Sequence, residues 1–210
     1  MNKNNICSLL FLCLLFPLGI NANNASPKWT MEFYAGAFEP EDENWSTYYG
    51  SSKMPQVGFS IAYRIFNVLD IGTNISYGRD QGKGDLPLNN LIAGDVVHEM
   101  LPVELYLLFR ARFTEGQWLV PYVGGGYTRF AYRQEVKGQD TVKGSVDGNH
   151  FRAGLQFLLD PLDEKSAQEI YRGFGVINSY LYLEYKQTEA EADKIKIGGT
   201  SYNMGLMLEF

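Results

Sequence analysis

The final stretch of the chain, residues 201–210, alternates in side-chain character with a period of two. One face is apolar and carries Tyr202, Met204, Leu206, Leu208 and Phe210. The other face is small or polar at most positions and ends in Glu209. Because successive side chains of a β-strand point to opposite faces, this pattern predicts a strand with one apolar surface.

The same alternation recurs upstream, in segments bounded by turn-forming residues. They cover residues 29–38, 56–66, 69–77, 98–113, 118–133, 150–157 and 177–186. When the charged residues of each segment are placed on one face, an apolar face remains opposite. Segments of about nine to eleven residues can cross a bilayer as tilted strands. The chain is therefore predicted to be all-β, an eight-stranded antiparallel up-and-down barrel that crosses a membrane with its apolar face outward.

The inward face of this barrel is predicted to hold a network of opposite charges. Its members are Glu32, Arg64, Asp70, Glu104, Arg110, Arg112, Arg129, Arg133, Arg152, Glu184 and Glu209. In a narrow lumen such charges need partners, because an unpaired buried charge costs several kcal/mol. Placing Arg129 and Arg133 inward puts Val120, Tyr122, Phe130 and Tyr132 on the outer face.

A soluble lipocalin-like barrel also alternates with period two, but it buries its apolar face around a ligand. Two features favour the membrane. Aromatic residues collect at the predicted strand ends, as interfacial girdles require. In addition, long connections at 39–55, 78–97, 134–149 and 187–196 alternate with tight turns at 67–68 and 114–117. With a periplasmic amino terminus, every long connection faces outward, as in outer-membrane barrels.

Residues 1–25 have the features of a secretory signal peptide. The apolar run from Ile6 to Ile20 is too short for a membrane span, and cleavage is expected after Ala22 or Ala25. Both cysteines of the sequence lie in this segment, so no disulfide is expected in the mature protein. The barrel domain is then residues 26–210. The formal net charge of −6 argues against a nucleic-acid partner.

A short amphipathic helix is predicted between the sixth and seventh strands, on the periplasmic side. Asp160 is a suitable N-cap, Pro161 suits the first helical position and Gly173 can end the helix. Its apolar side would carry Leu162, Ala167, Ile170 and Tyr171. That side needs a cover, which is the barrel mouth, the inner-leaflet surface or a periplasmic protein. We expect docking into the mouth first.

Over nearly the whole mature chain, the pattern resembles the small eight-stranded outer-membrane barrels of the outer-membrane protein W, opacity and outer-membrane protein A type. The stretch 157–163 (FLLDPLD) followed by 180–185 (YLYLEY) resembles an uncharacterised family within that group. The resemblance implies a monomer in the bacterial outer membrane, in contact with lipid and lipopolysaccharide. It also implies that the outer-membrane assembly machinery reads the closing strand through Tyr202, Leu206, Leu208 and Phe210.

Function is less constrained than fold, and we predict no catalytic, cofactor or metal site. Some small barrels are lipid A-modifying hydrolases or acyltransferases, whose chemistry uses a serine activated by a nearby histidine. His98 and His150 are instead expected to be solvated or hydrogen-bonded at the rim. The first expectation is a non-enzymatic envelope or surface-interaction protein. The alternatives are a narrow transporter for small molecules, hydrophobic ones included, and then a lipid A-modifying enzyme.

Overall fold

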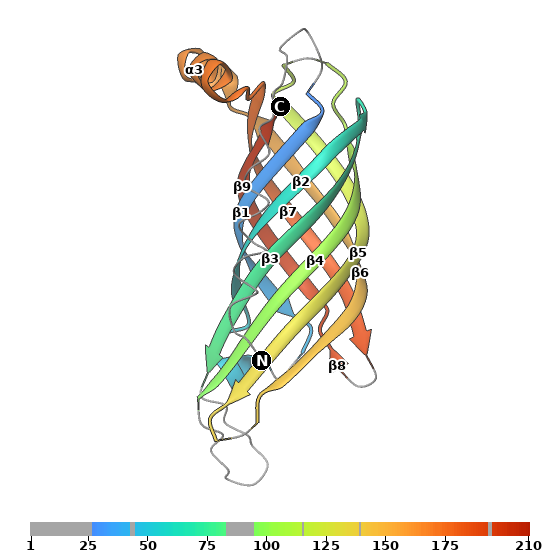
Figure 1. The fold of residues 1–210 in the computed structure, drawn as a ribbon, viewed down its shortest axis with the longest axis vertical. Helices are drawn as coiled ribbons and strands as arrows, with labels where there is room; N and C mark the ends of the chain where they lie inside the picture. The colour runs from blue at the N-terminus through green and yellow to red at the C-terminus, as the bar shows by residue number, and fades with distance from the viewer. Residues whose placement is uncertain (1–26, 43–44, 83–94, 115, 139, 193–194) are drawn as a thin grey trace, which may run out of the picture.

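The computed structural model describes residues 27–42, 45–82, 95–114, 116–138, 140–192 and 195–210. Over these residues the chain forms a long β-barrel of tilted strands, with helix α3 (Glu164–Phe174) at its side (Figure 1). The predicted signal peptide lies outside the described residues and stays a prediction.

Eight long strands form the barrel, and each pairs antiparallel with its neighbours. They are β1 (Trp29–Pro40), β2 (Met54–Phe66), β3 (Leu69–Gly82), β4 (Val96–Arg110), β5 (Leu119–Val136), β6 (Val142–Leu158), β7 (Asn178–Ala192) and β9 (Gly199–Glu209). Sequential neighbours pair from β1 to β7, and β9 pairs with both β7 and β1, which closes the sheet. A two-residue strand, β8 (Ile195–Lys196), pairs antiparallel with the end of β7. The predicted eight-stranded antiparallel barrel is confirmed.

The barrel has two different ends. The terminal rim is the end where β1 begins and β9 ends, uppermost in Figure 1, and Thr30 pairs there with Glu209. The tight turn at 67–68 lies at this rim, as predicted. The connection between β4 and β5 is wider than expected and spans 111–118. The loop rim is the opposite end, with the connections 41–53 and 137–141; the first holds α2 (Trp45–Tyr49).

The alternation of faces follows the prediction in seven of the eight strands. On β4, for example, Leu105 is 61% exposed, while its neighbours Glu104 and Tyr106 are 1% and 2% exposed. The exposed face is the apolar one and the buried face carries the charges, which is the reverse of a soluble protein. This arrangement buries polar side chains inside the barrel and leaves leucine, isoleucine, valine and phenylalanine for a hydrocarbon environment.

Strand β5 has the opposite phase from the prediction. Val120, Tyr122 and Phe130 are buried in the lumen, and the side chains of Arg129 and Arg133 are 61% and 45% exposed. Outward arginines are tolerated here because the strands are long: β5 has 18 residues and β6 has 17, more than a tilted strand needs to cross a bilayer. Most of the expected loop 134–149 is therefore strand. The outward arginines lie on the part of the wall nearest the loop rim, where water can solvate them.

The helical segment between β6 and β7 also differs in detail from the prediction. Asp160 belongs to a separate 3₁₀ turn, η2 (Asp160–Leu162), and the helix itself is α3 (Glu164–Phe174). Its N-cap is Asp163, which accepts hydrogen bonds from the backbone and hydroxyl of Ser166 at 3.1 and 2.7 Å. These bonds, the one from the hydroxyl first, lower the pKa of Asp163. Gly175, at φ 75°, ends the helix in place of Gly173.

The expected docking of α3 into the barrel mouth is not observed. None of its residues is buried, and Figure 1 shows the helix beside the terminal rim, clear of the barrel outline. Asp160 explains this position. Its carboxylate accepts a hydrogen bond from the backbone N–H of Ser179 at 3.1 Å, which ties η2 to the start of β7.

Candidate functional site: the filled lumen

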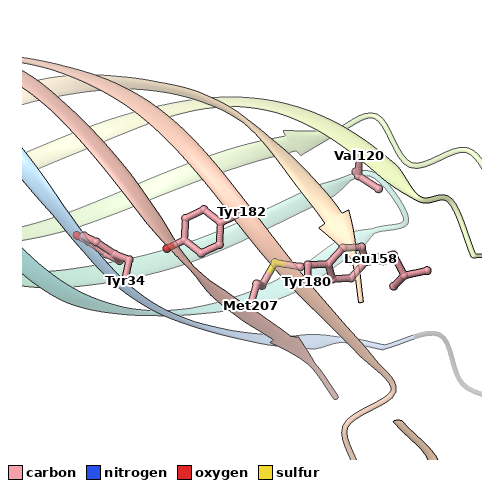
Figure 2. Packing of buried hydrophobic residues seen from close by; sticks show 6 residues of the cluster. All are labelled: Tyr34, Val120, Leu158, Tyr180, Tyr182 and Met207. Carbon is pink, nitrogen blue, oxygen red and sulfur yellow. The ribbon is translucent and has the colours of Figure 1, made fainter. Parts of the chain in front are cut away.

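Buried side chains lie in the lumen from the terminal rim to the loop rim. An apolar group made of Tyr34, Val120, Leu158, Tyr180, Tyr182 and Met207 lies in the half toward the terminal rim. Figure 2 shows these side chains between the strands, inside the barrel. Two ionic clusters and an apolar plug also lie in the lumen.

The terminal cluster is ionic and centres on Glu209, a residue of the last strand. Its carboxylate accepts from the guanidinium groups of Arg64 at 2.7 Å, Arg110 at 2.5 Å and Arg112 at 2.8 Å. Asp70 adds a second carboxylate, 2.9 Å from Arg64 and 3.5 Å from Arg110. Both carboxylates are fully buried. The cluster joins β2, β3, β4 and β9 across the lumen.

The middle cluster is built on Arg152 of β6. Its guanidinium forms ion pairs with Glu184 and, at 3.1 Å, with Glu32. It also lies over the rings of Tyr106 and Tyr122, at 4.7 and 5.7 Å from their centroids. Two carboxylates and two aromatic faces thus compensate the charge of this buried guanidinium.

A second ion pair completes the middle cluster. The Lys186 ammonium lies 2.6 Å from a carboxylate oxygen of Glu104, and both groups are buried. The Asn74 amide donates to Glu104 and to the Tyr34 hydroxyl, both at 3.1 Å. Lys186 is absent from the predicted charge network, although its inward position on the seventh strand is a signal that could have included it.

The plug at the loop rim is apolar. Phe38, Met54, Met100, Phe130, Val146 and Ala190 are buried together, and Trp45, Tyr132 and Ile197 pack against them. Trp45 comes from α2, in the connection 41–53, and its indole N–H donates to Asp80 at 3.1 Å. α2 therefore places Trp45 against the apolar plug at the loop rim.

The predicted network is thus divided between two places. Glu32, Arg64, Asp70, Glu104, Arg110, Arg112, Arg152, Glu184 and Glu209 lie in the two ionic clusters of the lumen. Arg129 and Arg133 do not belong to it. They form ion pairs on the outer wall near the loop rim, Arg129 with Asp147 at 3.7 Å and Arg133 with Glu99 at 3.3 Å. Such exposed pairs contribute little to stability.

Both histidines are buried and contact neighbouring side chains. The Nδ1 atom of His150 lies 2.7 Å from the hydroxyl of Thr128, and the ring of His98 packs edge-on against Trp45 with centroids 5.0 Å apart. In the part of the chain that the structure describes, no serine hydroxyl is hydrogen-bonded to either ring. Within the same residues, no group of His, Cys, Asp and Glu is arranged to hold a metal ion. None of the described helices is long and apolar enough to cross a membrane.

A groove on the outer wall has a volume of about 630 Å³. Small residues of β1 and β6, such as Ala35, Ala37 and Ala153, form its floor, with Leu183 and Met204 beside them. It opens on the apolar face and not into the lumen, so it adds surface for lipid contact and no route through the barrel.

The end of the closing strand is fixed by backbone hydrogen bonds to β1. The N–H of Phe210 donates to the carbonyl of Trp29 at 2.8 Å, and its own carbonyl accepts from Lys28 and Trp29. Tyr202 and Leu206 are exposed on the apolar face. The predicted role of Tyr202, Leu206, Leu208 and Phe210 as an assembly signal stays a prediction.

Phe210→Ala is expected to lower the yield of inserted barrel more than the stability of barrels that do insert. The substitution keeps the backbone bonds to Trp29 and removes only the terminal ring. The measurement is the amount of heat-modifiable protein in outer-membrane fractions, compared with the melting temperature of the purified barrel. Phe113→Ala is the matched control, because it removes an aromatic ring near the same rim that is not on the closing strand. Equal yields of the two variants would remove the assembly argument.

The fold and the lumen together define a class: a transmembrane β-barrel with an apolar outer wall and a filled interior. Residues 10–210 match the family described as outer membrane protein beta-barrel domain, and the chain belongs to that family. The family places the protein in the bacterial outer membrane. A comparison with curated proteins finds no match.

Several solved structures share the fold at low sequence identity. OprG from Pseudomonas aeruginosa is 10% identical, with a TM-score of 0.63 over 88% of this chain and 96% of that one. Neisserial surface protein A is 15% identical, with a TM-score of 0.53 over 90% and 100%. Ail of Yersinia pestis, solved with the heparin analogue sucrose octasulfate, is 11% identical, with a TM-score of 0.52 over 89% and 100%. At this identity the likeness supports the fold alone.

Proposed function

We propose that the protein is a closed, non-enzymatic outer-membrane barrel with a structural or surface-interaction role in the cell envelope. The observation that carries this proposal is the filled lumen. Side chains from opposite strands meet across it in two ionic clusters and two apolar groups. A solute could pass only if buried ion pairs separated, and breaking such a pair costs about 3–5 kcal/mol.

The loop rim is the surface we propose for interaction. β5 and β6 are long enough to carry the wall beyond the bilayer, and the exposed ion pairs of Arg129 and Arg133 suit water rather than lipid. Most basic side chains described there already contact an acidic one, as Lys137 does with Asp95 at 3.8 Å. A polyanion such as the heparin analogue bound to Ail is therefore not the expected partner. A neutral or basic surface fits better.

A second candidate is a gated transporter for small molecules. The observation that favours it is that Trp45, which packs against the plug, belongs to a connection between strands and not to a strand. One hydrogen bond to Asp80 holds its indole N–H. If this plug moved, the ionic clusters below it would still have to open for passage across the lumen.

Solute flux separates the two candidates. We expect vesicles that contain the native barrel to swell no faster in small sugars than empty vesicles, and we expect the same for Trp45→Ala. The ionic clusters remain intact in that variant, so the lumen stays closed. Swelling with Trp45→Ala but not with native protein would favour the transporter. An unchanged lipid A mass spectrum in a deletion strain is expected in parallel, and an altered one would favour the enzyme.

A further inference from the structure

The helix α3 carries an apolar stripe that nothing in the described structure covers. Ala167, Ile170, Tyr171 and Phe174 follow the i, i+3, i+4, i+7 spacing of one helix face. Phe174 is 78% exposed, and Leu162 of η2, next to the helix, is 70% exposed. The opposite side carries Lys165, Gln168, Glu169 and Arg172. Large exposed apolar side chains in such a stripe mark a contact surface.

The chain leaves the barrel wall for this helix at the level of an aromatic girdle. Four exposed aromatic side chains surround the terminal rim, namely Trp29, Phe66, Phe113 and Trp118. The N–H of Leu158, the last residue of β6, donates to the carbonyl of Trp118 at 2.9 Å. Aromatic girdles lie at the membrane–water interface. The segment η2–α3 therefore begins at that interface.

From that level the helix extends sideways and not under the lumen. Figure 1 shows α3 beside the terminal rim, at about the height of the carboxyl terminus and away from the barrel axis. Asp160 fixes this direction through its bond to Ser179. A helix displaced laterally from an outer-membrane barrel at girdle height has a lipid leaflet as its nearest neighbour.

We propose that α3 is a membrane-surface helix that lies in the headgroup region of the inner leaflet and inserts its apolar stripe among the acyl chains. The proposal assumes the outer-membrane location and a periplasmic terminal rim. Amphipathic helices of this kind lie in the plane of the interface, with the apolar side about 5–10 Å into the boundary of headgroups and chains. The helix would thus hold the periplasmic end of the barrel at a fixed depth.

The charges of the segment indicate which kind of lipid headgroup the helix would contact. Asp160, Asp163, Glu164 and Glu169 outnumber Lys165 and Arg172, so anionic headgroups would not attract it. Insertion must then be driven by the apolar stripe alone, which fits a zwitterionic phospholipid surface. A protein partner is less well matched. A helix of 11 residues is about 16 Å long and about 10 Å wide, and a stable interface buries about 800 Å² per partner.

Site-directed spin labelling of the whole barrel tests the proposal. The only cysteines in the sequence are Cys7 and Cys13, in the predicted signal peptide, so single cysteines can be placed on α3 of the mature protein. Ile170→Cys and Phe174→Cys report on the stripe, and Gln168→Cys and Glu169→Cys are matched controls on the opposite side. Each variant is checked for heat-modifiable migration and reconstituted in phosphatidylcholine vesicles.

We expect the stripe labels to shift toward oxygen accessibility and away from a water-soluble nickel chelate, relative to the controls. Equal accessibility of all four labels would overturn the proposal. Insertion that appears only after phosphatidylglycerol is added would overturn it too, because charge would then be the driving force. In cells, a photocrosslinker at position 174 is expected to capture lipid, and capture of a specific periplasmic protein there would replace the lipid surface with a protein partner.

Discussion

Replacing Glu209 with alanine is expected to lower the free energy of unfolding by about 3–5 kcal/mol. The substitution leaves Arg64, Arg110 and Arg112 without their shared carboxylate and with Asp70 as the remaining ion-pair partner in the terminal cluster. Uncompensated guanidinium groups in a narrow lumen repel one another and have lost their hydration. The measurement is urea unfolding of the barrel in phospholipid vesicles, followed by gel migration and tryptophan fluorescence.

The matched control for Glu209→Ala is Arg129→Ala, which removes an ion pair at the exposed outer wall. The partners there are 3.7 Å apart, and exposed pairs typically contribute about 0–1 kcal/mol. A small loss at Arg129 together with a large loss at Glu209 would support the placement of the two groups. Similar losses at both positions would show that the terminal cluster is hydrated and not buried as described.

Leu105→Arg is the second change with a large expected effect. Leu105 is exposed on the apolar face of β4, five residues from Met100 of the loop-rim plug and five residues from Arg110 of the terminal cluster. An arginine facing lipid near the middle of the bilayer costs about 2–4 kcal/mol. The same unfolding measurement in vesicles checks the value.

Phe113→Arg is the control for depth, since Phe113 lies in the girdle at the terminal rim, where such a change costs about 0–1 kcal/mol. Tyr106 is not a suitable control on the neighbouring lumen side, because its ring lies 4.7 Å from the Arg152 guanidinium and its loss would disturb the middle cluster. If Leu105→Arg and Phe113→Arg were equally tolerated, the outer face of β4 would not lie in hydrocarbon.

Sequence periodicity was sufficient to predict the fold and most of the lumen. Within the bilayer, an outward charged side chain on β1, β4 or β9 would face lipid. An inward one can pair with an opposite charge in the lumen, so these side chains are expected inside. The inward positions of Glu32, Glu104 and Glu209 follow from that rule. The boundaries of the tight turn at 67–68 follow from the same alternation.

The rule failed where a strand leaves the bilayer. On β5 an outward arginine is stable in water, and Phe130 can close the lumen, so charge no longer identifies the inner face. The choice of ion-pair partners also lay beyond the sequence. Arg64 and Glu209 are 145 positions apart, and their contact depends on the closure and tilt of the barrel. A helix was predicted in the segment between β6 and β7, but its caps are Asp163 and Gly175 and not the predicted Asp160 and Gly173, and its direction depends on Asp160 and Ser179.

Glu209 lies on β9, the strand that closes the barrel, and this position has a consequence for the order of assembly. Until β9 is in place, a partly assembled sheet holds Arg64, Arg110 and Arg112 without the carboxylate that all three share. Only the arrival of β9 between β7 and β1 brings the missing negative charge. Pairing of these arginines with Glu209 and closure of the seam are therefore one event, so an open barrel differs from a closed one in the unpaired charge at the terminal rim as well as in shape.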